Sequence, residues 1–177
     1  MNEKISNGMK LKKILPFVIV AIFLTLFCFL IMRYRKILVE IPKGEQSFIV
    51  KETKFVKIGG QMIKVELATT EETQKRGLSG RTMMKDGEGM LFIFSKPGKY
   101  FFWMKEMNFP IDMIWLAPSD VGIDKNFKVI YIKKDADPSS YPESFGPDVD
   151  NQYVLEVSAD FSEKNNLKEG DRVEFLR

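Results

Sequence analysis

The longest apolar run of the chain lies near its N-terminus. Residues 14–32 read ILPFVIVAIFLTLFCFLIM, nineteen residues without a charged side chain. As a helix this run would rise roughly 28 Å, which matches a bilayer hydrocarbon core of about 30 Å. A buried core helix has a polar face where it borders water, and Thr25 alone does not make one. The pattern therefore predicts a transmembrane helix at 14–32.

Basic residues flank this segment on both sides. Four lysines lie in the N-terminal tail 1–13, and four basic residues lie in the linker 33–46. Residues 30–35 contain no small residue of the kind that signal peptidase needs, so we expect an uncleaved anchor. The positive-inside count is equal on the two sides. The short basic tail favours a cytoplasmic N-terminus, which places the C-terminal domain outside the cell membrane in a single-pass topology.

Short apolar or alternating segments separated by turn residues fill residues 47–177. Strands 55–58 and 61–68 flank Gly59-Gly60, which predicts a tight hairpin. Pro97-Gly98 predicts a second hairpin that joins strand 90–95 to strand 100–105. Further strands are predicted at 111–116, 127–133, 153–158 and 172–176. With about seven strands, the domain is expected to be mainly β, a small closed or partly open barrel or a sandwich.

Two short helices interrupt the predicted strands. Thr69 and Glu72 have the spacing of a capping box, which predicts a helix that starts there and ends at Gly77. A second short helix is predicted at 159–165. The stretch 135–151, rich in Asp, Pro and Ser, is predicted to be a long surface loop.

Composition limits the chemistry that this domain can perform. The chain has no histidine, and its one cysteine, Cys28, lies in the apolar segment. The sequence therefore predicts no His/Cys zinc site, no nucleophile paired with histidine, no disulfide and no cofactor. Residues 47–177 carry 19 basic and 21 acidic residues, a net charge of −2. This balance gives no electrostatic footprint for nucleic acid as a partner.

Two carboxylates interrupt strands that are otherwise apolar. Alternation places Asp112 on the same face as Ile114 and Leu116, so it lies at the wet end of its strand or is buried with a partner. Lys105 and Arg81 are the expected counter-charges. Glu156 faces opposite to its neighbours Leu155 and Val157, and a solvent-facing position is an equally good reading.

Four consecutive aromatic residues begin at Tyr100 and precede Lys105 by one methionine. Alternation places Phe101, Trp103 and Lys105 on one face of this segment. A core role is the more common one for such a stripe. If this face lines a cleft, Trp103 offers a stacking surface and Lys105 a cation.

Several short motifs together resemble the DUF192 family, also called UPF0127. They are RGLSGR at 76–81, GMLFIF at 89–94, FWMK at 102–105, PID at 110–112, YVLEV at 153–157 and GD at 170–171. The resemblance covers about residues 62 to 175. It differs at Glu106-Met107, where the family usually has Asn-Thr, and at Ala159-Asp160, where it usually has Ala-Gly.

The resemblance implies a small β-rich domain, often exported or anchored behind an apolar segment, and no mechanism. Five residues match motif positions of the family and are the candidate binding residues: Arg81, Trp103, Lys105, Asp112 and Glu156. Three functions remain open. The first is a membrane-anchored, extracytoplasmic module that binds a ligand or a protein partner. The second is an enzyme with acid–base chemistry on Asp112 or Glu156. The third is a structural network of buried charges.

Overall fold

The computed structural model describes residues 22–31, 53–119 and 126–177. The chain divides into two compact units, Met1–Pro42 and Lys43–Arg177. In the first unit, residues 22–31 form a helix with exposed apolar side chains. Within the described residues, no helix is long and apolar enough to cross a bilayer. The rest of the predicted segment 14–32 lies outside the described residues, as do the tail 1–13 and the linker 33–46.

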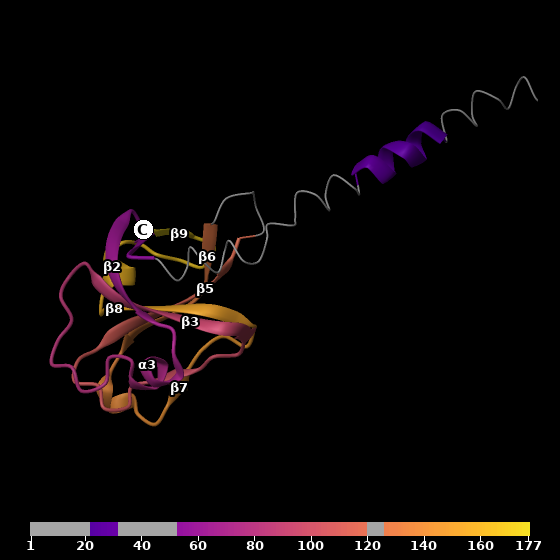
Figure 1. Cartoon of the computed structure of the whole chain (residues 1–177). Coiled ribbons are helices and arrows are strands. Elements are labelled where there is room, and N and C mark those ends of the chain that lie inside the picture. The colour runs from indigo at the N-terminus through magenta and orange to yellow at the C-terminus, as the bar shows by residue number, and fades with distance from the viewer. Residues whose placement is uncertain (1–21, 32–52, 120–125) are drawn as a thin grey trace, which may run out of the picture. The chain divides into compact units, whose positions relative to one another are not determined.

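Seven strands of the second unit close into a barrel (Figure 1). Around the barrel they follow the order β1 (Phe55–Ile58), β2 (Gln61–Ala68), β3 (Glu88–Gly98), β8 (Asn151–Ser158), β5 (Ile111–Pro118), β6 (Asn126–Ala136) and β9 (Arg172–Leu176). Antiparallel pairing between β1 and β9 completes the circle. The structure confirms the predicted mainly β class and, among the predicted alternatives, selects the closed barrel. The predicted Gly59-Gly60 hairpin of β1 and β2 is also confirmed.

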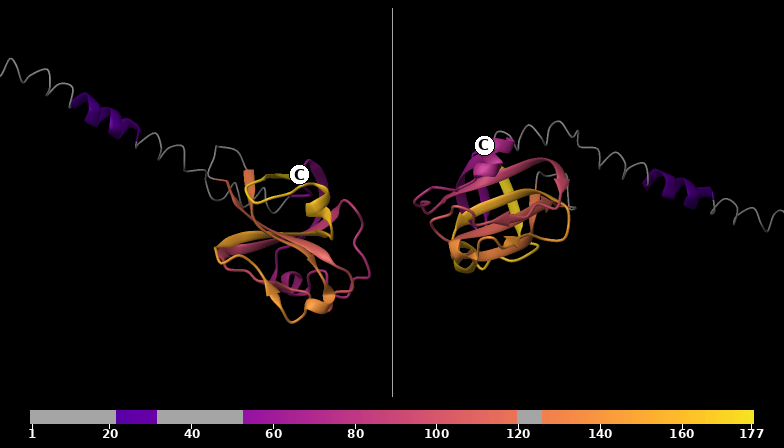
Figure 2. Two further views of the ribbon diagram at one scale, coloured as in Figure 1. Left: turned by 180° about the vertical axis from the view of Figure 1, so that it is seen from behind. Right: turned by 90° about the horizontal axis from the view of Figure 1, so that it is seen from below.

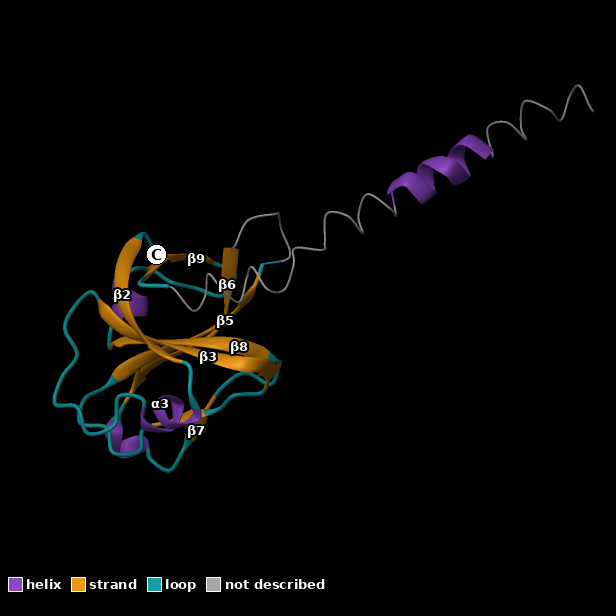
Figure 3. Cartoon of the chain, in the orientation of Figure 1, coloured by secondary structure: helices purple, strands orange, loops and turns teal. Residues whose placement is uncertain are grey.

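Only β2 and β3 are paired in parallel among the described strands. A parallel pair needs a crossover connection, and here the crossover carries helix α3 (Glu71–Arg76). Figure 1 shows α3 on one side of β3 and β8, with β2, β6 and β9 on the other side, and Figure 3 shows the same layers by secondary structure. The view from behind shows the same arrangement (Figure 2).

A separate two-stranded sheet, β4 (Phe102–Trp103) and β7 (Ser144–Phe145), lies on the same side as α3. We call α3, β4, β7 and their connecting loops the cover. Strand β5 is buried on both faces because one face lines the barrel and the other meets the cover. Ile114 and Leu116 belong to the core inside the barrel. Met113 and Trp115 belong to a second core between the sheet and the cover.

The predicted second hairpin is wrong. Strand β3 continues through Pro97 to Gly98 along β8, and the segment after it pairs with β7 rather than with β3. The Tyr100 ring stacks on Phe94 with a centroid distance of 3.5 Å, so the chain folds over β3 instead of beside it. The predicted loop 135–151 is wrong in part, since it contains β7 and the short 3₁₀ helix Pro138–Ser140.

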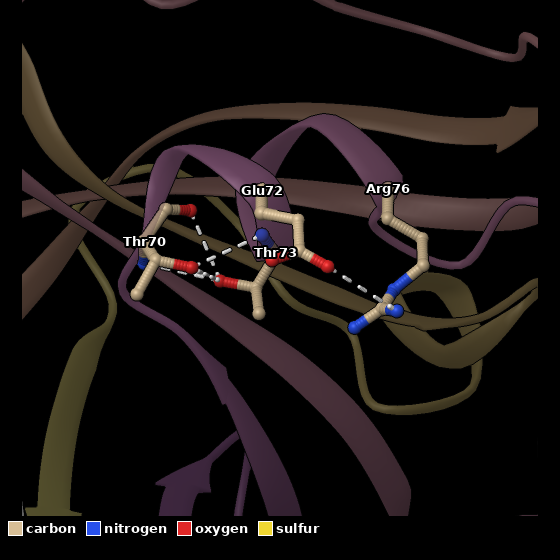
Figure 4. Close-up of polar contacts among 4 residues, drawn as sticks. All are labelled: Thr70, Glu72, Thr73 and Arg76. Carbon is tan, nitrogen blue, oxygen red and sulfur yellow. Dashed lines mark hydrogen bonds and ion pairs between the residues drawn. The ribbon is translucent and has the colours of Figure 1, made fainter.

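The capping box of α3 begins one residue later than predicted. Thr70 is the N-cap, and its Oγ1 accepts from the Thr73 N–H at 3.2 Å while its own N–H donates to Thr73 Oγ1 at 3.0 Å (Figure 4). Glu72 instead pairs with Arg76 at 4.0 Å. Two adjacent threonines offer two registers, and the extended backbone of Thr70 selects the later one. The helix ends at Gly77 as predicted.

The predicted helix 159–165 is confirmed in a shorter form, α4 (Phe161–Lys164). Asp160 precedes it in the left-handed region, with φ of 65°. A second non-glycine residue with positive φ, Glu106 at 57°, follows β4. At both positions the sequence differs from the residue usual in the resembling family, Gly in place of Asp160 and Asn in place of Glu106, and both of these residues tolerate this conformation.

Candidate functional site

A cleft of about 310 Å³ opens between α3 and β4, with β3 and β8 beneath it. Its lining combines aromatic side chains, charged residues of α3 and one carboxyl from β8. The lining residues are Glu71, Gln74, Lys75, Arg76, Gly77, Leu78, Ser79, Phe92, Phe94, Tyr100, Phe101, Phe102, Trp103, Met107 and Glu156. Two of the five predicted site residues, Trp103 and Glu156, are therefore brought together here.

Packing among the aromatic rings fixes the walls of the cleft. Phe94 and Tyr100 stack, and Phe102 meets Phe92 edge to face with a centroid distance of 4.8 Å. Phe101 and Trp103 are 50% and 57% exposed, whereas Phe102 between them is partly buried. The predicted alternation is confirmed, because Phe102 and Met104 pack into the second core while the opposite face of the segment is open. Exposed aromatic rings beside a cleft provide surfaces for stacking.

Glu156 lies at the floor of the cleft. It is only 5% exposed and faces the second core, where Met90 of β3 and Met113 of β5 are its cross-strand neighbours. A solvent-facing position, one of the two readings from the sequence, is therefore wrong. Burial raises the pKa of Glu156 to about 8, against a smaller opposing effect of Arg81. The carboxyl is thus mainly protonated at neutral pH.

One oxygen of this carboxyl has no partner in the fold. Glu156 Oε2 is buried and makes no hydrogen bond within the part of the chain that the structure describes. Leaving a buried polar atom unsatisfied costs about 1–3 kcal/mol. Sites that keep such an atom are candidates for ligand contact, since a ligand can supply the missing hydrogen bond.

Glu66 orients the Arg81 side chain, and Glu66 lies on the same face of the sheet as Glu156. Its two terminal nitrogens donate to the two carboxylate oxygens of Glu66 at 2.7 and 2.8 Å. Glu66 and Glu156 both pair across strands with Met90, so all three side chains share the outer sheet face. The hydrogen bonds to Arg81 hold the pKa of Glu66 below its usual value and raise that of Arg81.

Backbone and side-chain bonds connect the turn after α3 to the segment after β4. Gly80 N–H donates to the Glu106 carbonyl at 2.8 Å, and Ser79 Oγ donates to the Lys105 carbonyl at 2.9 Å. Asn108 Nδ2 donates to the Arg81 carbonyl at 2.8 Å. These bonds join the turn that carries Ser79 and Arg81 to the segment that follows Trp103, so they connect two walls of the cleft.

Lys105 does not line the cleft. Its side chain is exposed and lies 3.8 Å from the Glu106 carboxylate, while its carbonyl serves the wall through Ser79. The predicted role of Lys105 as a cation beside Trp103 is therefore not supported by its position. The chemistry that Lys105 contributes to this region comes from its backbone.

Asp112 is fully buried but belongs to a different part of the molecule. It pairs across strands with Val157 and faces the barrel interior, opposite to Glu156. Its Oδ1 accepts from the Asp135 N–H at 2.9 Å and its Oδ2 accepts from the Ser162 N–H at 2.7 Å. The predicted ion pair with Lys105 or Arg81 is wrong, because backbone amides supply the partners that this carboxylate needs.

Sequence reasoning missed the contribution of α3, whose residues Glu71, Lys75 and Arg76 line the cleft. The capping pattern located the helix but gave no sign of what its exposed face meets. Phe101 could have been predicted as a lining residue, because it lies on the same face as Trp103 in an alternating segment. Among the described residues, no group of three or more acidic, cysteine or histidine side chains is arranged to hold a metal ion.

Known proteins share both the sequence pattern and the fold. The family model DUF192, described as "Uncharacterized ACR", matches residues 54–175. A protein of unknown function from Novosphingobium aromaticivorans has a similar structure, with a TM-score of 0.61 and 28% identity over 68% of this chain and 84% of that one. A Sinorhizobium meliloti protein, whose suggested role is that of a transcription regulator, gives a TM-score of 0.60 and 28% identity over 68% of this chain and 92% of that one.

No curated protein matches this chain. The family match spans more than half of the sequence and includes all of the barrel strands except Leu176, the last residue of β9. It also contains all five predicted site residues, including Trp103 and Glu156, which line the cleft. This chain belongs to the DUF192 family.

Proposed function

We propose that this domain is a binding module that takes a small organic ligand into the cleft between α3 and β4. One observation carries the proposal, namely that Oε2 of Glu156, at the floor of an aromatic cleft, has no hydrogen-bond partner among the described residues. A volume of about 310 Å³ suits a ligand of one or two rings. The fold provides apolar walls and, at the floor, a carboxyl oxygen to which no described residue makes a hydrogen bond. Small-molecule sites commonly combine apolar walls with a few polar groups.

The exposed rings support the same proposal. Trp103 and Phe101 keep half or more of their surface in contact with solvent, although the neighbouring Phe102 and Met104 are packed into the core. Burying apolar surface yields roughly 25 cal/mol for each Å². A ligand that covers these two rings therefore gains binding energy from surface that the fold leaves open.

A membrane location is part of the proposal. The uncharged stretch 14–32 has the length of a spanning helix, and its described residues 22–31 are helical with exposed apolar side chains. With the basic tail 1–13 in the cytoplasm, the binding domain would lie outside the cell membrane. Protease added to intact cells then removes the domain and spares the tail. Protection that is lost on permeabilisation would contradict this orientation.

Acid–base catalysis is the second candidate, and the pKa of Glu156 near 8 favours it, because general acids and bases are tuned toward neutral pH. Asp112, the other predicted acid–base residue, lies on the opposite face of the sheet and cannot assist Glu156. The role suggested for the Sinorhizobium protein does not extend to this domain, whose net charge of −2 gives no attraction for nucleic acid.

The proposed function is tested by a screen of small aromatic compounds. The full-length protein is placed in lipid nanodiscs, and ligand binding is followed by saturation-transfer NMR against empty nanodiscs. We expect hits whose signals vanish in Trp103→Ala and persist in Tyr141→Ala, a matched loss of an exposed aromatic ring that does not line the cleft. Hits that survive Trp103→Ala, or a screen without hits, would overturn the proposal. Turnover of a hit that stops in Glu156→Gln while binding continues would favour the enzyme.

A further inference from the structure

We infer that the cleft accepts a planar, uncharged ring bearing one hydrogen-bond acceptor, such as a carbonyl oxygen, and discriminates against the ammonium and carboxylate forms of the same ring. This inference rests on the proposed function, because it names the ligand class of that cleft. Three features carry it: the arrangement of the rings, the state of each polar side chain in the lining, and the charges around Glu156.

The rings of the lining leave faces and edges that suit a flat partner. Phe94 and Tyr100 lie nearly parallel, with an interplanar angle of 8°, and Phe102 stands almost perpendicular to both Phe92 and Phe94. A planar ligand can stack on one ring while its edge meets another, and such pairs contribute about 0.5–1.5 kcal/mol beyond area burial. A saccharide would leave most of its hydroxyl groups unpaired against these walls, at a cost for each one.

Three polar side chains of the walls already donate within the fold. Gln74 Nε2 donates to the carbonyls of Ala68 and Ile93 at 3.3 and 2.8 Å. Ser79 Oγ donates to the Lys105 carbonyl, and the Tyr100 hydroxyl donates to the Lys96 carbonyl at 2.8 Å. Glu156 Oε2 is left without a partner in the described ranges 22–31, 53–119 and 126–177. A ligand therefore meets one free carboxyl at the floor, and a protonated carboxyl donates to an acceptor.

The charged group that acts on Glu156 is Arg81, from the turn after α3, and Arg81 is already paired. Glu66 from β2 and Glu88 from β3 act in turn on Arg81. Glu71, Lys75 and Arg76 from α3 line the cleft. The Arg81 guanidinium is already held by Glu66, so it offers no fork to a carboxylate. An ammonium group meets a protonated rather than an ionised carboxyl at the floor, because burial raises the pKa of Glu156. A neutral acceptor avoids both penalties, since it needs no counter-ion in a desolvated site.

The test compares three probes that share one ring: benzamide, benzylammonium and benzoate. Each is titrated into the full-length protein in nanodiscs at about pH 6.5, where burial keeps Glu156 protonated. We expect benzamide to bind at least about tenfold more tightly than either ion. Glu156→Gln keeps a neutral donor and should retain benzamide binding, whereas Glu156→Met should weaken it by about tenfold.

A second arm uses pH. Raising the pH to about 9.5 ionises Glu156 and removes its donor, so benzamide affinity should fall in the wild type and stay constant in Glu156→Gln. Preferred binding of benzylammonium or benzoate at the lower pH, lost in Trp103→Ala, would overturn the ligand class and leave the binding cleft in place. Absence of binding by all three probes would remove the cleft as a ligand site and this inference with it.

Discussion

Two carboxyl groups on adjacent strands show how differently one fold can treat the same chemistry. Asp112 at the barrel end is paired across strands with Val157, the residue next to Glu156, yet the two acids face opposite sides of the sheet. Both are almost fully buried. Each oxygen of Asp112 accepts from a backbone amide, whereas Oε2 of Glu156 accepts from none among the described residues.

The number of hydrogen-bond partners distinguishes a structural carboxyl from a candidate binding carboxyl better than burial does. The carboxylate of Asp112 is fully satisfied, because α4 and the end of β6 bring the two donors that it needs. The cleft floor is incomplete, because the cover leaves Glu156 with apolar neighbours and one cation that Glu66 already holds. An acid that is satisfied from within stabilises the fold, and an acid that is not is available to a ligand.

The pH dependence of stability should show the largest difference between the two regions. Glu156 has a folded pKa of about 8 against an ordinary value of 4.5, so the folded state holds a proton that the unfolded chain has released between these limits. The free energy of unfolding should therefore fall as pH rises through this window, by a little over 1 kcal/mol for each pH unit and roughly 5 kcal/mol in total. Urea unfolding at several pH values, followed by Trp115 fluorescence, measures it.

The control for this prediction is Glu156→Gln, which has the same shape and does not titrate. Its unfolding free energy should lack the Glu156 contribution, so the difference between the two proteins should widen steadily toward higher pH. A difference that is constant across the window would show that Glu156 is not protonated in the fold. It would also remove the electrostatic contrast between the two carboxyl regions.

Removing Asp112 should cost about 3 kcal/mol of unfolding free energy, because Asp112→Ala leaves the N–H groups of Asp135 and Ser162 without an acceptor in the barrel end. Glu156→Met is the matched change on the other face and should be neutral or slightly stabilising near pH 7, since it removes an unpartnered polar atom. Chemical denaturation of both variants tests the comparison. Equal losses would mean that the two acids do the same structural work.

Sequence patterns located most of the barrel. The β1–β2 hairpin followed from alternating residues around Gly59-Gly60, and the ends of β5, β8 and β9 were placed within a few residues. The cover was less accessible, because β4 pairs with β7 across some forty residues and neither strand exceeds two residues. Such a pairing depends on tertiary contacts and leaves no periodic signal.

The sequence predicted some residues of the site but not how they are arranged. The sequence identified Trp103 and Glu156. It does not show which side of the sheet each carboxylate faces, because a strand such as β8 is buried on both faces and so has no polar face to mark the outside. The partners of Asp112 lie 23 and 50 residues away and are backbone amides, which every residue except proline has. Side-chain charge alone favours Lys105 and Arg81 as the partners of Asp112 and cannot identify backbone donors.

Changing Glu66 should alter the pKa of Glu156 without altering the fold. In Glu66→Gln, Arg81 loses its anionic partner and its charge acts more strongly on Glu156, so the pKa of Glu156 should fall below about 8. Stability should change by less than about 1 kcal/mol, since the Arg81–Glu66 pair is largely exposed. Carboxyl-carbon NMR titration reports the pKa. Glu174→Gln, which removes a carboxylate paired with Arg172 instead, should leave it unchanged.

The smallest effect concerns the turns that hold the two regions. Glu106 has a positive φ of 57°, and its carbonyl accepts from Gly80 in the wall of the cleft. Asp160 has a φ of 65°, and its N–H donates to the Asp135 carboxylate beside the Asp112 site. Aspartate tolerates the left-handed region better than glutamate, because its shorter side chain can bond to the local backbone. The turn at the cleft is therefore the more strained of the two.

Glu106→Asn should relieve that strain and raise the unfolding free energy by about 0.5 to 1 kcal/mol, whereas Asp160→Asn should change it by less. Glu169→Asn is the control, since this exposed glutamate is not among the residues with positive φ and should gain nothing. Denaturation midpoints of the three variants provide the measurement. A gain at Glu169 equal to that at Glu106 would mean that asparagine acts through surface charge. A gain at Glu106 alone would show that the cleft wall, unlike the barrel end, is held in place against a backbone preference.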